Sequence, residues 1–262
     1  MDLFELVQEH VATFLLLLTR VSGIFLLAPF FGSMNVPVTI RAGAAVAFSV
    51  VLFPVVDSFS VVEAPDSALV YAGTVLQELF IGWLIGLVAF MAFAAINMAG
   101  KVMDMQVGFA IVNVMDPTSG QQIPLIGSFL YNLGVIILLV TNGHHMIIAA
   151  LAESFRTVPI GGMQYDTTLS MMIGNLMTSM FTTGMKIAMP VTFAILLTNV
   201  GLGILARTMP QMNIFVVGLP LQLMIGMSML AMLFPFYILF LDVIFDAMYR
   251  DISLALDTLA PK

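Results

Sequence analysis

Apolar residues along the chain gather into six long blocks separated by short polar breaks. A membrane-spanning helix needs about 20 apolar residues. The second block is slightly short of that length, and the third and fifth are long enough to tilt, kink or run past a bilayer. The pattern predicts helices at Val11–Phe31, Ala42–Val56, Leu69–Ala99, Ile123–Thr141, Leu169–Leu205 and Ile214–Leu241.

Proline and glycine punctuate this pattern both between and within the blocks. Between the last two blocks stands the turn sequence "RTMPQMN", and inside the fifth and sixth stand Pro190 and Pro235. Broken helices are tolerated in a membrane only where neighbouring protein or a water-filled cavity satisfies the freed backbone groups. We therefore expect these helices to pack against other protein. His145–Phe155 is expected to form a further short amphipathic helix.

Composition places the chain far outside the range of soluble domains. Of its 262 residues, 61% are hydrophobic and 9% charged, with a mean hydropathy of +1.09. Soluble domains carry roughly 45–50% apolar and about 25% charged residues. No polar segment is long enough for a separate soluble domain. The prediction is an all-α integral membrane protein, a single polytopic membrane domain over residues 1–262.

Charge and cysteine content exclude several function classes. The formal charge is −7 and no basic patch is present, which argues against nucleic acid as a partner. The absence of cysteine excludes disulfides, thiolate catalysis and cysteine metal sites. The acidic N-terminal decapeptide "MDLFELVQEH" and the acidic loop 57–67 carry no Lys or Arg. Both are therefore expected outside, with Arg41 and Lys101 near inside-facing connections.

Glu78 stands inside an apolar block, in "LQELFIGWLIGL". A carboxylate at mid-bilayer costs about 2.5–3.5 kcal/mol on insertion scales. It is therefore interpreted as an interhelical partner of a cation or as a residue near the interface, with an ion or proton site as the alternative. The cations considered are Arg20, Lys186 and Arg207.

Two further features of the sequence have simpler interpretations. Gly82 and Gly86 form a G-x-x-x-G pair, a spacing that lets two helix backbones approach closely. His144 and His145 are adjacent in a glycine-containing turn, where capping is favoured over a metal site. No catalytic, nucleotide-binding or metal motif is recognised, so we expect no enzymatic activity and no cofactor.

"GFAIVNVMDPTSGQQIP", from Gly108 to Pro124, does not fit either simple class. Its first half is too apolar for a free loop, and its two glycines and two prolines are unsuited to a helix in lipid. Backbone of this kind is tolerated where it lies inside protein or along a cavity.

Several motifs in the chain, in the same order and with the same spacing, resemble the FliR family of the type III export gate. They are "RVSGIFLLAPFFGSMNVPVTIRAGAAVAFSVVLFP", "QELFIGWLIGLVAF", "AGKVMDMQVGFAIVNVMDP", "NGHHMIIAALAESFRTVPIG" and "PVTFAILLTNVGLGILARTMPQMNIFVVGLPLQ". Members of the family are subunits of the bacterial flagellar export machinery, and related subunits serve virulence secretion systems. The motif "ARTMPQMNIF" favours the flagellar branch.

The resemblance implies an arrangement of kinked helical hairpins, as if FliP-like and FliQ-like units were fused. It also implies assembly with FliP and FliQ into a helical pore in the inner membrane, at the flagellar basal body. Further partners implied are FlhB, FlhA, membrane lipid and unfolded flagellar export substrates. The alternatives are the equivalent subunit of a virulence secretion system and a small-molecule secondary transporter.

In this family the loop after the third apolar block projects into the pore and helps to close it. Carried onto this sequence, the loop is residues 106–122, called the plug segment below. An apolar constriction blocks water and ions by dewetting. Met103 and Met105 are expected beside the plug. The residues assigned to the plug are Met105, Gly108, Phe109, Ile111, Val112, Val114, Met115, Asp116, Pro117 and Gly120.

Overall fold

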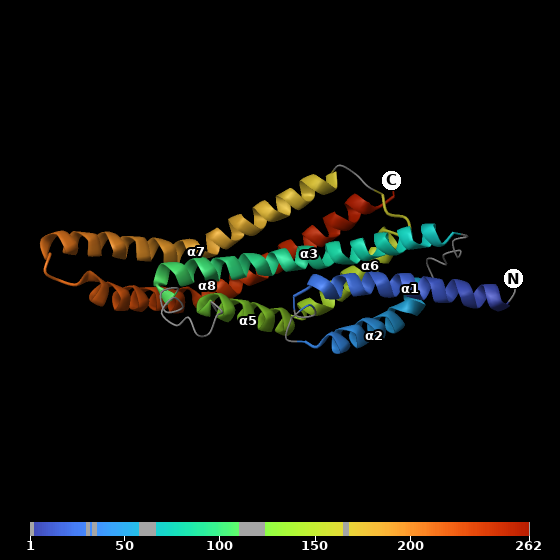
Figure 1. Cartoon of the computed structure of the whole chain (residues 1–262), viewed down its shortest axis with the longest axis horizontal. Helices are drawn as coiled ribbons and strands as arrows, with labels where there is room; N and C mark the ends of the chain where they lie inside the picture. Colours follow the sequence, from blue (N-terminus) through green and yellow to red (C-terminus); the bar gives the residue numbers. More distant parts are fainter. Residues whose placement is uncertain are drawn as a thin grey trace. The chain divides into compact units, whose positions relative to one another are not determined.

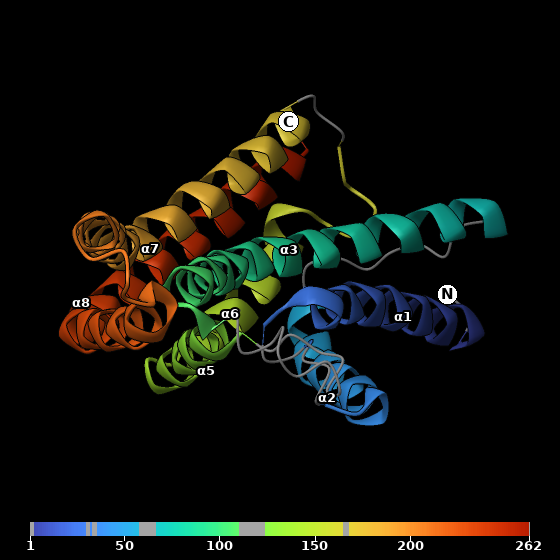
Figure 2. The ribbon, with the colours of Figure 1, turned by 60° about the vertical axis from the view of Figure 1, so that its left-hand side comes forward.

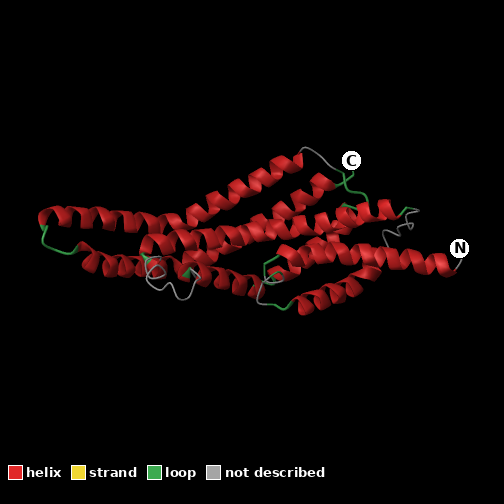
Figure 3. Cartoon of the chain, viewed as in Figure 1, coloured by secondary structure: helices red, strands yellow, loops and turns green. Residues whose placement is uncertain are grey.

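A computed structural model of the chain describes residues 3–29, 32, 36–57, 67–109, 124–164 and 168–261. Throughout this part of the chain the regular structure is helical and contains no strand (Figures 1 and 3), so the all-α prediction is confirmed. The helices are α1 (Leu3–Leu27), α2 (Val38–Asp57), α3 (Ala68–Val107), α5 (Leu125–Val140), α6 (Gly143–Thr157), α7 (Thr168–Thr208) and α8 (Ile214–Leu259).

Five of these helices are long and apolar enough to cross a membrane, or six if α5 and α6 together form one span. The prediction of about six apolar helical segments is therefore confirmed. Proline stands inside three of the helices, at Pro54 of α2, Pro190 of α7, and Pro220 and Pro235 of α8. Each proline removes one backbone hydrogen bond and favours a bend, as expected for kinked hairpins.

Several helices extend beyond the predicted apolar blocks. Helix α3 continues past Ala99 to Val107, and α8 continues past Leu241 to Leu259. The extensions contain charged residues such as Lys101, Asp104 and Asp242, where hydropathy falls while helix propensity stays adequate. Hydropathy thus marks the apolar part of a helix and not its ends.

The described chain divides into two compact units. The first contains residues 1–91, 138–176 and 245–262, and therefore α1, α2, α6 and parts of α3, α7 and α8. Helices α1 and α2 pack side by side in both views (Figures 1 and 2). The core of this unit includes Leu17 and Val21 of α1, Ile81 and Ile85 of α3, and Leu151 of α6, all at most 3% exposed.

The second unit contains residues 92–137 and 177–244. Within it, α7 and α8 form a hairpin that turns at 209–213, the predicted "RTMPQMN" break (Figure 1). The Gln222 side-chain amide donates a hydrogen bond to the Asn199 side-chain oxygen across the hairpin, at 2.5 Å. The core of this unit includes Phe93 and Ile96 of α3 and Ile195 of α7.

The helices differ greatly in how much of their apolar surface the chain itself covers. In the apolar stretch of α3, 61% of residues are buried, against 17% in α2 and 22% in both α7 and α8. The chain itself therefore covers most of the apolar stretch of α3, whereas α2, α7 and α8 present most of their apolar side chains outward. Lipid or other protein must cover that outward surface.

Candidate functional site

The described part of the plug segment is its start. Gln106 and Val107 complete α3, so the loop begins about two residues later than the sequence suggested. Met105, in the last turn, is 72% exposed. Phe109 is half-buried. The other assigned plug residues lie outside the described residues and remain predictions: Ile111, Val112, Val114, Met115, Asp116, Pro117 and Gly120.

Gly108 ends α3 in a conformation suited to glycine. Its φ is +100°, a value that residues with a side chain rarely adopt. Its N–H donates to the Asp104 carbonyl at 3.2 Å and closes the last turn. This is a common way for a helix to stop. The glycine therefore fixes the residue at which the chain leaves α3.

Asp104 links α3 and α5, the two helices between which the plug segment lies in the sequence. Its Oδ1 accepts a hydrogen bond from the Ile126 N–H at 2.9 Å, and its Oδ2 accepts one from the Gly127 N–H at 3.1 Å. Both donors lie in the first turn of α5, where backbone N–H groups lack partners within the helix. The carboxylate, which is 5% exposed, therefore caps α5 from the last turns of α3.

A close backbone contact supports this cap. A Cβ added at Gly100 would overlap the backbone of Gly127, so the two helices approach to a distance that only glycine allows. At the same end of α3, Val107 packs against Gly226 of α8, where an added Cβ would lie 2.5 Å from a Val107 methyl group. The end of α3 is thus held by close contacts with the start of α5 and with α8.

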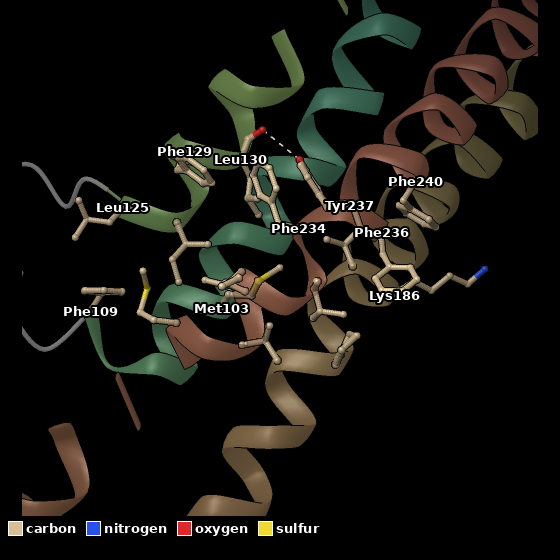
Figure 4. A pocket seen from close by; sticks show the side chains of 18 residues that line it. Met103, Phe109, Leu125, Phe129, Leu130, Lys186, Phe234, Phe236, Tyr237 and Phe240 are labelled. Atoms are coloured by element: carbon tan, nitrogen blue, oxygen red, sulfur yellow. Dashed lines mark hydrogen bonds between the residues drawn. The ribbon is translucent and has the colours of Figure 1, made fainter. Parts of the chain in front are cut away.

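An apolar cavity of about 460 Å³ lies beside these anchor points. Its walls come from the end of α3, from α5 and from the α7–α8 hairpin. Figure 4 shows Phe109, which belongs to the plug segment, and Leu125, which follows it, at one end of the cavity, and Lys186 and Phe240 at the other end. The hydroxyl of Tyr237 donates to the Leu130 carbonyl at 3.1 Å. Met103, expected beside the plug, also lines the cavity.

In the first unit, Glu78 contacts one of the three cations considered for it. Arg20 Nε donates to Glu78 Oε2 at 2.6 Å, and both side chains are 0% exposed. The other carboxylate oxygen, Oε1, accepts the Gly161 N–H at 3.1 Å. Glu78 is therefore an interhelical partner between α3 and α1, and each of its carboxylate oxygens accepts a hydrogen bond.

The remaining nitrogens of Arg20 reach the C-terminal end of α6. Nη1 donates to the Ser154 carbonyl at 2.8 Å, and Nη2 donates to the Val158 carbonyl at 3.0 Å. The guanidinium also lies 4.1 Å from the ring centroid of Phe155. A cation is favoured where the last carbonyls of a helix lack partners. One buried arginine thus connects α1, α3 and α6.

Glycines allow α1 and α3 to approach closely enough for this pairing. A Cβ at Gly82 would overlap the Arg20 carbonyl oxygen, and one at Gly23 would lie 2.6 Å from the Leu79 carbonyl oxygen. One turn further along α3, a Cβ at Gly86 would lie 3.1 Å from the Ile24 carbonyl oxygen. Gly82 and Gly86 therefore lie in a tight helix contact, the kind of packing for which the G-x-x-x-G spacing is known.

The other two cations considered for Glu78 belong to the second unit. Lys186 lies on α7 at the rim of the apolar cavity, and its side chain is exposed. Arg207 lies in the last turn of α7 and is also exposed. Within the described ranges, no three His, Asp or Glu side chains come together as metal ligands would.

Sequence reasoning did not single out Asp104, the residue that links α3 and α5. Its signal was present: a lone carboxylate in "KVMDMQVGF", near the end of an apolar helix and just before a glycine. The groups that it caps could not be identified from the sequence, because these α5 amides lie more than twenty residues further along the chain.

Comparison with known proteins identifies the family. The model of the family described as bacterial export proteins, family 1, matches residues 11–248. The flagellar biosynthetic protein FliR of Bacillus subtilis (strain 168) is 34% identical over 249 residues, covering 94% of this chain and 92% of the relative. The FliR protein of Escherichia coli (strain K12) is 29% identical over 233 residues, covering 89% and 88%.

A third relative, the FliR protein of Aquifex aeolicus (strain VF5), is 34% identical over 229 residues, covering 87% of both chains. The matches span nearly the whole length of the chain, including α1 with Arg20, α3 with Glu78 and Asp104, and the α7–α8 hairpin. The chain belongs to family 1 of the bacterial export proteins, the family of the flagellar biosynthetic protein FliR.

Proposed function

We propose that this chain is a non-enzymatic subunit of the flagellar type III protein export gate in the bacterial inner membrane. With FliP and FliQ it forms a helical pore through which unfolded flagellar substrates pass, and the plug segment helps to seal that pore when it is closed. FlhB and FlhA are its further neighbours. The relatives at 34% identity are all named for flagellar biosynthesis, which favours this role over a virulence secretion system.

The observation that carries the proposal is the length of the exposed apolar surface. Helix α7 has 41 residues and therefore measures about 60 Å, whereas the hydrocarbon core of a bilayer is about 30 Å thick. Its outward apolar side chains extend from Met171, 60% exposed, to Ile204, 61% exposed. A single bilayer leaves much of this surface uncovered. Other apolar subunits would cover the rest.

The α8 partner of the hairpin supports the same argument. It has 46 residues, and large apolar side chains remain exposed from Phe215, at 80%, to Leu254, at 55%. An obligate subunit of an assembly exposes such surface when it is alone, because the neighbours that bury it are missing.

The sealing role rests on how the plug segment is held. Gly108 fixes where the chain leaves α3, and Asp104 binds the start of α5, the helix that follows the segment. An apolar segment between two linked helices can return to one closed position after a substrate has passed. Opening breaks no covalent bond, because apolar contacts alone close the constriction and an entering polypeptide can push the apolar side chains aside.

Copurification tests the assembly. A tagged version of this chain, expressed with FliP and FliQ from the same bacterium, is expected to bring both down in a detergent-stable complex. Expressed alone, it is expected to aggregate, since the α7–α8 surface then has no neighbour. A chain that stays monodisperse alone and recovers neither partner would contradict the proposal. A matched control is an unrelated polytopic membrane protein carrying the same tag.

A further inference from the structure

Arg20, Glu78 and Lys186 are three of the charged residues that lie inside long apolar helices, and the chain pairs two of these three with each other. Arg20 and Glu78 pair with each other while both are fully buried. The third residue is Lys186, near the midpoint of the 41-residue helix α7. Within the described part of the chain, Lys186 makes no ion pair and no hydrogen bond.

Such a cation requires a partner. Charged residues inside membrane helices almost always pair with another group or face water, because an unpaired charge in an apolar medium is costly. Helix α7 contains no carboxylate, and neither does α8 before Asp242. In the same unit, the Asp104 carboxylate is already occupied by two amides of α5. The chain therefore offers Lys186 no free acid from α7 or from the first part of α8.

The surroundings of Lys186 resemble the centre of a protein interface. Its side chain stands at the rim of the 460 Å³ cavity and is directed away from the cavity's far end (Figure 4). Large aromatic side chains of the cavity wall are exposed, including Phe236 at 66% and Phe129 at 56%. Clusters of aromatic side chains are enriched at protein interfaces and often act as their anchors.

We propose that this surface, defined by Lys186 and the aromatic rim Phe129, Phe234, Phe236 and Phe240, is a docking site for a neighbouring subunit. The occupant is an apolar helix of that subunit which carries one Asp or Glu side chain. The carboxylate pairs with Lys186, and the apolar side chains one turn away fill the cavity. This inference rests on the proposed function, since it names how one partner of the gate is recognised.

Charge complementarity favours a protein carboxylate over a lipid headgroup. Lipid phosphates lie at the membrane surface, where flanking basic residues near helix ends reach them. Arg207, in the last turn of α7, has such a position. Lys186 has instead about 20 apolar or neutral residues on either side within α7. A helix carrying a carboxylate can meet it at that depth.

The test compares charge variants of Lys186 in the complex with FliP and FliQ. Lys186→Glu places two carboxylates together and is expected to lower the recovery of one partner by at least about tenfold. Lys186→Arg keeps the charge and is expected to retain at least part of the wild-type recovery.

The double variant Met185→Lys with Lys186→Met keeps composition and net charge but turns the ammonium about 100° around the helix. It is expected to behave like Lys186→Glu.

A rescue experiment identifies the partner group. Each Asp or Glu within an apolar helix of FliP and FliQ is changed to Lys, one at a time, in the presence of Lys186→Glu. One such reversal is expected to restore recovery, as a swapped pair would. The inference is overturned if every Lys186 variant recovers as much FliP and FliQ as the unaltered chain does. It is also overturned if no charge reversal in FliP or FliQ restores recovery. Loss of the unaltered complex when anionic lipid is removed, with its return on adding phosphatidylglycerol, would also overturn it, because this result would assign Lys186 to lipid.

The two levels of proposal fail differently. If the unaltered chain recovers neither FliP nor FliQ, the proposed function fails. If the unaltered chain recovers both and the Lys186 variants recover as much, only the docking site fails. A melting curve of each variant's purified complex shows whether the variant is folded. Where no complex forms, the amount of the variant in the membrane fraction and its resistance to limited proteolysis there serve the same purpose.

Discussion

Glu78→Ala is expected to destabilise the chain by about 3–5 kcal/mol, the usual cost of removing one partner of a buried ion pair. The carboxylate accepts a 2.6 Å hydrogen bond from Arg20 and a second bond from the Gly161 amide. Its removal leaves a buried guanidinium without its counter-charge and an amide without its acceptor. The variant is expected to lose the packing of α1 against α3.

The control is a double-mutant cycle with Arg20→Leu and Glu78→Leu. If the pair acts as a unit, the double variant loses much less stability than the sum of the two single losses. Unfolding is followed by the fluorescence of Trp83, the single tryptophan of the chain, which is adjacent to the Gly82 contact. Additive losses would contradict the pairing.

Deletion of residues 108–120 is expected to open the pore to ions in cells that also make FliP and FliQ. The deletion can be joined without distorting the helices, since Asp104 already holds the start of α5 against the end of α3. Leakage is measured as collapse of membrane potential and as sodium entry. A membrane that stays tight, with export unchanged, would contradict the sealing role.

Two variants separate the length of the plug from its chemistry. The first replaces Ile111, Val112, Val114 and Met115 with serine and keeps every residue position. It is expected to leak nearly as much as the deletion, because a polar constriction stays wet. The second, Asp104→Ala, keeps the apolar residues and frees the start of α5. It is expected to leak less than the deletion.

The helices of this chain could be predicted from hydropathy, and their ends could not. Long, largely apolar blocks marked α1, α7 and the centre of α3. The end of α3 and the last turns of α8 carry charges, and there the decisive forces are helix propensity and local capping. The apolar block ended at Ala99, whereas in the structure α3 continues to Val107 and ends at Gly108, with its positive φ.

The partners of charged residues were harder to predict than the helices. Glu78 was expected to face one of three cations, and nothing local distinguishes Arg20 from Lys186 or Arg207. The choice depends on the glycine contact between α1 and α3, which brings Arg20 within reach. The cap that Asp104 provides depends likewise on tertiary packing. For the plug segment, the residue assignments still rest on family resemblance.

The most direct test of the account is whether the plug segment lines the path of an exported protein. The chain contains no natural cysteine, so Val112→Cys introduces a unique thiol. A flagellar substrate with one cysteine is stalled in the gate, and disulfide formation is measured under mild oxidation. The account predicts a strong cross-link at position 112 and none for Val140→Cys, which is 75% exposed at the end of α5. Equal cross-linking at both positions, or none at 112, would contradict it.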